Sequence, residues 1–196
     1  MSFAPPPQTA AWRHITARTG FEVVYFRPLE GGHHVEGCTT AAEDGLTWAV
    51  DYAIDVDATW TTRRARIRSR SAAGARNTLL EADGAGGWLV DGERAPHLDG
   101  CLDVDLESSA MTNAFPVHRL GLAVGAGAPA PAAYVRALDL AVERLDQDYA
   151  RVSDRCYDYA APVFGVACRL VYDESGFVLD YPGLAARVLD LGRAGS

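Results

Sequence analysis

Residues 46–70, LTWAVDYAIDVDATWTTRRARIRSR, decide the fold because two stretches of alternating side chains flank a short polar break. In residues 46–56 large apolar side chains take every second position, with aspartate or alanine between them. Successive side chains of a β-strand point to opposite faces, so this pattern predicts a strand with one buried face. Residues 61–70 alternate in the same way, with arginine on the polar side. The stretch therefore predicts an antiparallel hairpin.

The turn of this hairpin sets which residues face each other. With Ala58 and Thr59 as the turn, Tyr52 lies opposite Ala65 and Asp51 lies opposite Arg66. The polar face then carries an arginine stripe that resembles an anion site, made of Arg64, Arg66, Arg68 and Arg70. The facing aspartates favour a simpler interpretation, a solvated face with cross-strand pairs of opposite charge.

Further hairpins follow along the chain. Residues 78–91 have a glycine-rich turn between two apolar segments, and residues 166–183 have a second turn at Asp173 to Gly176. Residues 133–146 fit both a helix and a strand, with local propensity favouring the helix. The tail that follows Pro182 and Gly183 has the composition of a short terminal helix.

The chain divides into a lead and one domain. Pro5, Pro6 and Pro7 can neither continue a helix nor donate to a strand ladder, so residues 1–9 are expected to form a disordered lead. Residues 10–192 are expected to form a single antiparallel β domain, which suits a chain of 196 residues.

Composition excludes several classes of function. A formal net charge of −8 disfavours nucleic acid and anionic lipid surfaces, which attract basic proteins. No apolar run reaches the ~20 residues of an integral membrane helix. The four cysteines are isolated, which predicts no metal site and reduced thiols. A cytoplasmic protein without metal or cofactor is therefore expected.

The segment that most resembles a reactive site is residues 100–120, GCLDVDLESSAMTNAFPVHRL. Asp103 and Asp105 lie two apart on an expected strand, so both carboxylates point to one side. Paired carboxylates can act as acid and base on a sugar or phosphate ester, which leaves a hydrolase as an alternative function. The chain lacks a nucleophile elbow, a phosphate-binding loop and a dinucleotide fingerprint, so no catalytic residue is predicted.

Aromatic side chains are abundant on the expected strands. A curved sheet whose concave face carries aromatic rings can enclose an acyl chain and hold a polar head at its rim. Binding of an amphipathic small molecule is thus a better prediction than catalysis.

Several blocks of the chain resemble, in the same order, a bacterial family of glycolipid-binding proteins. The specific part is LDGCLDVDLESSAMTN, residues 98–113, followed by FPVHRL, residues 115–120. Supporting blocks are LTWAVDYAIDVDATWTTR at residues 46–63 and FVLDYPGLAARV at residues 177–188. Ala110 and His118 depart from the family pattern, which favours proline and arginine there.

The resemblance implies a mostly β fold, an antiparallel sheet curled into an open half-barrel similar to bacterial lipoprotein carriers. Residues 133–146 then become a strand against their propensity. It also implies a glycolipid or related amphipathic ligand. We expect the protein to be a monomer or homodimer. A protein-interaction domain remains a further alternative function. Residue type and position in the matching blocks indicate the candidate ligand contacts: Trp48, Tyr52, Trp60 and Trp88 for the apolar wall, and Arg64, Asp103, Arg119 and Tyr149 for the polar head.

Overall fold

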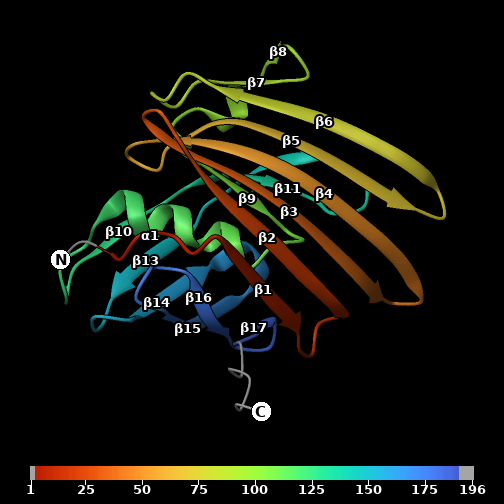
Figure 1. The fold of residues 1–196 in the computed structure, drawn as a ribbon. Coiled ribbons are helices and arrows are strands. Elements are labelled where there is room, and N and C mark those ends of the chain that lie inside the picture. The colour runs from red at the N-terminus through yellow and green to blue at the C-terminus, as the bar shows by residue number, and fades with distance from the viewer. Residues whose placement is uncertain (1–2, 190–196) are drawn as a thin grey trace.

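A computed structural model describes residues 3–189, and one large curled antiparallel sheet dominates it (Figure 1). Its strand order is β10-β13-β14-β15-β16-β17-β1-β2-β3-β4-β5-β6-β7-β8. Within the described residues its edges, β10 and β8, do not pair with each other, so the sheet is not closed into a barrel. The predicted mostly β, open antiparallel architecture is confirmed.

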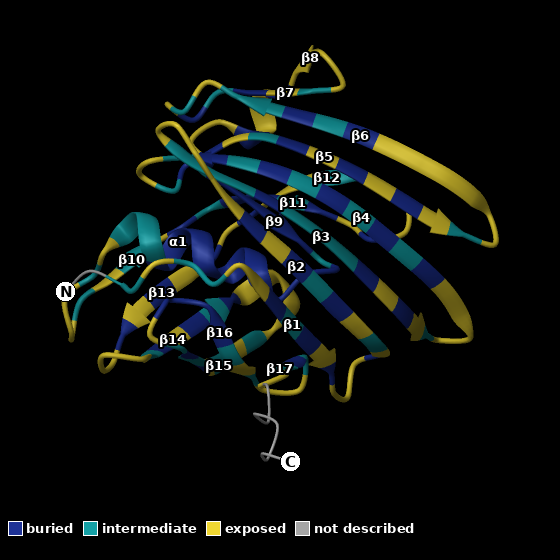
Figure 2. Cartoon of the chain, in the orientation of Figure 1, coloured by how far each residue is buried: buried dark blue, intermediate teal, exposed yellow. Residues whose placement is uncertain are grey.

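The N-terminal part of the sheet is a meander of hairpins. Its strands are β1 (Thr9–His14), β2 (Thr19–Leu29), β3 (Gly32–Glu43), β4 (Leu46–Asp57), β5 (Thr62–Ser71), β6 (Gly74–Ala82), β7 (Trp88–Val90) and β8 (Glu93–Arg94). In Figure 2 buried residues alternate with intermediate ones along β4 and mostly with exposed ones along β5, as the period of two in the sequence predicts. The predicted hairpins at residues 46–70 and 78–91 are both present.

The C-terminal part is a second meander. It contains β10 (Gly127–Pro129), β13 (Asp148–Arg151), β14 (Cys156–Ala161), the 3-10 helix η3 (Pro162–Phe164), β15 (Val166–Tyr172), β16 (Val178–Tyr181) and β17 (Ala185–Arg187). Strands β17 and β1 pair antiparallel, with Trp12 opposite Arg187. This pairing of the first and last strands joins the two meanders into one sheet.

The segment between the meanders folds into the concave side of the large sheet (Figure 1). Its elements are η1 (Pro96–Leu98), β9 (Asp103–Leu106), η2 (Met111–Asn113), the only described α-helix α1 (Ala114–Leu120), β11 (Ala132–Val135) and β12 (Val142–Leu145). Strands β12, β11 and β9 form a small separate sheet in which β9 and β11 run parallel. This parallel pair is the one departure from the expected antiparallel pairing among the described strands.

The core lies between the large sheet and this inserted segment. Inward side chains of β1 to β6, such as Trp12 and Ile54, share one buried apolar cluster with Val104, Met111 and Phe115 of the insert. A second cluster joins the C-terminal strands to the end of α1. Hydrogen bonds add to the contact, because Thr39 Oγ1 donates to the Ser108 carbonyl at 2.8 Å and Ser69 Oγ donates to the Ala137 carbonyl at 2.6 Å.

The predicted register of the β4–β5 hairpin is wrong by two residues. Tyr52 lies opposite Ile67 and not Ala65, and Asp51 lies opposite Arg68 and not Arg66. The turn is wider than two residues, since the Asp57 N–H donates to the Thr61 carbonyl, and the register shifts at a bulge between Asp55 and Val56. The wider turn and the bulge each shift the pairing by one residue, and together they shift it by two, so the buried faces still match.

Three local expectations also change. Residues 133–146 form β11 and β12 with a turn between them, as the family resemblance implies and against helical propensity. The segment after Gly183 is strand β17 and not a helix, because it pairs with β1; the rest of that expected helix lies outside the described residues. Helix α1 was not predicted, since its seven residues are too few to show helical periodicity.

The expected N-terminal lead makes definite contacts in the structure. The Ala4 N–H donates to the Glu174 carbonyl at 2.9 Å, and Ser175 Oγ donates to the Pro5 carbonyl at 2.9 Å. The Phe3 ring packs against His118 at 4.6 Å between centroids. Over the described residues no helix is both long and apolar enough to cross a membrane.

Candidate functional site

The concave face of the half-barrel is filled by the protein itself. Trp48, Tyr52 and Trp88, expected to form a free apolar wall, are buried in the cluster that contacts the inserted segment. The Trp88 indole N–H donates to the Cys101 carbonyl at 2.8 Å, and the Tyr52 hydroxyl donates to Glu22 Oε1 at 2.5 Å. These three aromatic side chains therefore belong to the core between the sheet and the insert and do not form a free apolar wall.

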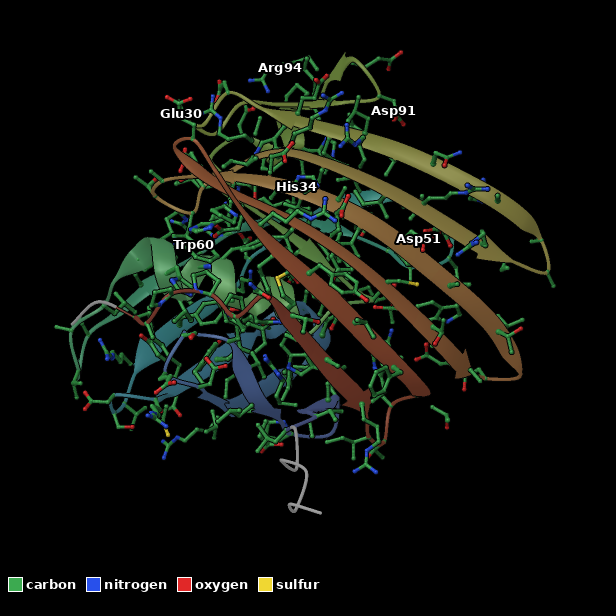
Figure 3. All side chains as sticks on the ribbon, viewed as in Figure 1. Glu30, His34, Asp51, Trp60, Asp91 and Arg94 are labelled. Carbon is green, nitrogen blue, oxygen red and sulfur yellow. The ribbon has the colours of Figure 1, made fainter. Side chains whose placement is uncertain are left out.

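The other expected contact residues are dispersed. Arg64 lies on the outer face of β5, 3.9 Å from Glu81, so it cannot reach the interior. Trp60 lies beside α1 and stacks on His118 at 3.8 Å (Figure 3). Asp103 forms a two-pronged ion pair with Arg119. Tyr149 is buried and donates its hydroxyl to Asn113 Oδ1 at 2.9 Å.

One pocket combines aromatic rings with a buried carboxyl group, and we call it the tyrosine pocket. It opens where the small sheet and η2 face strands β14 to β16, and the β1–β2 turn closes one side. Its volume is about 210 Å³, below the roughly 300–1,000 Å³ of typical ligand pockets, which suits one headgroup ring better than a whole lipid. It is lined by Arg18, Asp105, Leu106, Glu107, Ser109, Asn113, Tyr134, Leu145, Tyr159, Phe164, Val166, Tyr181 and Leu184.

Asp105 is the acidic group of the tyrosine pocket. Strand β9 directs Asp103 and Asp105 to the same side, as predicted, but of the two only Asp105 lines the pocket. Thr112 Oγ1 donates to Asp105 Oδ1 at 2.8 Å, and no ion pair to Asp105 exists among residues 3–189. Burial raises the pKa of Asp105 to about 6, so the carboxyl changes charge just below neutral pH.

A second buried acid, Glu22 on β2, anchors the loop that lines the pocket. Its Oε1 accepts hydrogen bonds from the hydroxyls of Tyr52 and Ser109, and its Oε2 accepts one from the Ala110 N–H at 2.9 Å. Burial raises the pKa of Glu22, and these hydrogen bonds act in the opposite direction. Because Ser109 also lines the pocket, its hydrogen bond to Glu22 sets the position of this part of the lining.

The tyrosines of the pocket act as neutral hydroxyl groups. Burial is the main cause that raises the pKa of Tyr134, Tyr159 and Tyr181, and the nearby Asp105 charge raises each further. Tyr159 and Tyr181 pack edge to face at 5.9 Å between centroids, and Tyr134 packs against Phe164 at 5.2 Å. The lining therefore offers ring faces together with hydroxyl donors and acceptors.

Apolar side chains surround the mouth of the tyrosine pocket. Phe164 of η3 lines the pocket and is 50% exposed, and its neighbour Val163 is more exposed still. The exposed Ile15 lies beside Leu184, because the Ile15 N–H donates to the Leu184 carbonyl at 3.0 Å. A polar pocket with an apolar rim is amphipathic, as a ligand with a sugar head and an acyl chain would require.

Larger hollows elsewhere lack this combination. One of about 560 Å³ lies over the outer face of β3 to β6, where Asp51 pairs with Arg70 at 2.7 Å (Figure 3). Another, of about 440 Å³, lies between the N-terminal segment, Trp60 and His118. Burial lowers the pKa of His118 to about 4, so that ring is neutral at physiological pH. Neither hollow contains a buried carboxyl group.

Of the pocket residues, sequence reasoning singled out only Asp105, as one of the two carboxylates of the hydrolase alternative. Tyr159 and Tyr181 stood out only as aromatic residues on strands, and Asn113 only as part of the family block. Arg18 and Tyr134 carry no local signal, because one lies in a turn and the other in a segment of ambiguous periodicity. Of the eight expected contacts, three touch pocket residues from behind: Trp48 through Arg18, Tyr52 through Ser109, and Tyr149 through Asn113.

Replacement of Asp105 by Asn is expected to stabilise the protein above pH 7. The pKa of Asp105 is about 6 when folded and near 3.8 when unfolded, so the folded state binds more protons between these values. The free energy of unfolding of the wild type therefore falls as pH rises through about 6. Asn carries no charge at any of these pH values, so the variant avoids this loss of about 2–3 kcal/mol. Urea unfolding of both proteins from pH 4 to 8 measures the difference, which should vanish near pH 4. A difference independent of pH would contradict the raised pKa.

The fold and the pocket define a class of protein: an open antiparallel β half-barrel, filled by its own small sheet and helix, with a polar pocket between the small sheet and strands β14 to β16. A family model described as "Putative glycolipid-binding" matches residues 9–187, and the chain belongs to this family. A crystal structure of a DUF1089 family protein from Pseudomonas aeruginosa is 35% identical, with a TM-score of 0.76 over 90% of this chain and 95% of that one. No curated protein matches. The resemblance predicted from the sequence is confirmed.

Proposed function

We propose that the protein binds a glycolipid without catalysis, with the sugar in the tyrosine pocket and the first part of the acyl chain on the apolar rim. The observation that carries this proposal is the lining itself. Ring faces of Tyr134, Tyr159 and Tyr181 suit the C–H faces of a sugar, and Asp105 and Asn113 suit its hydroxyl groups. The description of the family supports the same class of ligand.

The alternative of a hydrolase acting through Asp103 and Asp105 receives no comparable support. Asp103 is 1% exposed and both its oxygens accept hydrogen bonds from Arg119, at 2.9 and 2.6 Å. A pair of carboxyl groups acts as acid and base only when both reach the substrate. Since Asp105 lines the pocket and Asp103 does not, the pair does not share a substrate site.

The state of the cysteines supports a cellular location for the proposed function. Cys38, Cys101, Cys156 and Cys168 are free thiols in the structure, which suits a reducing compartment. We therefore place the protein in the cytoplasm, as a monomer or homodimer that carries or senses the lipid.

Native mass spectrometry with matched lipids tests the proposal. The protein is incubated with glucosyl diacylglycerol or with the same diacylglycerol that lacks the sugar. Retention of one glucosyl lipid per chain, with no retention of the sugar-free lipid, is the expected result. Equal retention of both would show that the sugar is not recognised, and retention of neither would contradict lipid binding.

Replacement of Phe164 by Ala is expected to weaken binding of a retained glycolipid about 5–30-fold. The exposed ring borders the pocket, and its loss removes about 1–2 kcal/mol of apolar contact with the ligand. The matched control is Phe21→Ala, since Phe21 is an exposed ring on the outer face of β2. Titration calorimetry should show weaker binding for Phe164→Ala alone. Equal effects of the two substitutions would place the ligand elsewhere.

A further inference from the structure

Arg18 is a buried cation in the tyrosine pocket whose hydrogen bonds are incomplete. Its side chain is 5% exposed, yet Nε and Nη1 have no hydrogen-bond partner. The nearest carboxylate oxygen, Glu43 Oε2, is 3.8 Å from Nε, which is too far for a hydrogen bond. The Trp48 ring covers the guanidinium from one side, at 5.2 Å.

Other buried arginines of the chain show how such a group is normally satisfied. Arg151 donates to the carbonyls of Leu122, Ser153 and Asp154, and Arg119 donates twice to Asp103. Arg187 leaves one nitrogen without a partner, whereas Arg18 leaves two and also lines a pocket. An unsatisfied buried charged donor is unfavourable, so its retention at a pocket indicates that a ligand supplies the acceptor.

The acceptor that fits best is a carboxylate. The Nη2 group of a guanidinium donates in parallel with Nε on one edge and with Nη1 on the other, so a carboxylate that binds either edge satisfies one of the two unpartnered nitrogens of Arg18. Neutral hydroxyl groups satisfy a guanidinium less well. The acids of the pocket do not fill this role, because within residues 3–189 no ion pair joins Arg18 to Asp105 or Glu107. These acids and Asn113 remain to accept sugar hydroxyl groups from the same ligand.

We infer that the headgroup of the bound glycolipid is an acidic sugar, a hexuronic acid, whose carboxylate binds Arg18. This inference rests on the proposed function and names the sugar class of the same pocket. The net charge of −8 disfavours general attraction of anions, so a preference for the acid would come from Arg18 and not from the surface as a whole.

Two lipids that differ only at C6 of the sugar test the inference. Glucuronosyl diacylglycerol carries a carboxylate at C6, and glucosyl diacylglycerol carries a hydroxymethyl group there. Native mass spectrometry and calorimetry of the full chain should show at least tenfold tighter binding of the glucuronosyl lipid. Phosphatidylglycerol, an anionic lipid without a sugar, should bind at least tenfold more weakly than the glucuronosyl lipid.

Variants of Arg18 connect the preference to this residue. Arg18→Met keeps the apolar stem against Trp48 and should abolish the preference for the acid. Arg18→Lys keeps the charge without the planar fork and should retain only part of it. The control Arg13→Met removes an exposed arginine of the neighbouring strand and should change nothing.

The outcomes separate the inference from the proposed function. Equal or tighter binding of the glucosyl lipid would overturn the acidic sugar and leave glycolipid binding intact. A preference for the acid that survives in Arg18→Met would overturn the role of Arg18. Binding of phosphatidylglycerol as tight as that of the glucuronosyl lipid would indicate a general anion site, and binding of no lipid would overturn the proposed function itself.

Discussion

Replacement of Arg119 by Met is expected to lower the free energy of unfolding by about 3–5 kcal/mol at pH 7. Asp103 is 1% exposed, and burial raises its pKa while the hydrogen bonds and charge of Arg119 oppose that shift. Without the guanidinium, an ionised carboxylate remains buried without compensation. The loss should shrink as pH falls, because protonation of Asp103 removes the uncompensated charge.

Urea unfolding measures this change, and two further variants interpret it. Arg136→Met removes an exposed arginine that pairs with Asp139 at 3.5 Å, and we expect a change below about 0.5 kcal/mol. The double variant Asp103→Leu with Arg119→Met removes both charges of this pair, so neither is left buried without its partner and most of the stability should return. A loss below about 1 kcal/mol in Arg119→Met would show that Asp103 is solvated, which would reopen its use as a catalytic carboxylate.

Replacement of Trp88 by Ala is expected to cost about 3–5 kcal/mol of stability as well. Trp88 is 1% exposed, and its indole N–H donates to the Cys101 carbonyl in the segment that leads into β9. The substitution leaves a cavity the size of an indole and an unpaired buried carbonyl. Both losses act on the contact between the large sheet and the inserted segment.

The effect of Trp88→Ala on ligand binding separates a core residue from a ligand wall. At a temperature well below the unfolding transition, the variant should bind a glycolipid with the affinity of the wild type. Phe164→Ala is the reciprocal case, since it should weaken binding with little change in unfolding temperature. If Trp88→Ala lost ligand binding while its stability stayed unchanged, Trp88 would be a ligand contact and not a core residue.

These expectations share one physical basis, which is that the protein fills its own half-barrel. A typical carrier of lipid would leave the concave face free, whereas here β9, η2 and α1 occupy it. Stable apolar contacts then lie in the interior, and the ligand recognition that we propose is assigned to the tyrosine pocket. Asp105 and Arg18 both reduce stability where they are, and such local disadvantages are typical of functional sites.

Local patterns of the sequence predicted the strands well. Period-two alternation identified β4, β5 and β15, and glycine-rich turns identified the hairpins that join β6 to β7 and β15 to β16. The face of each strand followed as well, because side chains alternate strictly between the faces of a sheet. Both pieces of information are encoded within about ten consecutive residues.

The register, the filling of the concave face and the site depended on contacts between distant segments. The bulge at Asp55 shifted the β4–β5 pairing, and β17 became a strand only because β1 lies beside it. The pocket brings Arg18 together with Asp105 and Tyr159, which lie in a turn and on two separate strands.

The sequence by itself determined the antiparallel strands, since alternation and turns are local features. It also determined the family, and through the family resemblance the open half-barrel, because the matching blocks of residues occur in order along the chain. Only the tertiary structure decided that Trp48, Tyr52 and Trp88 are core residues and that the tyrosine pocket exists. An apolar strand face must be buried, but its pattern does not state whether a ligand or the protein's own insert covers it. Packing between segments far apart in the chain settles that choice.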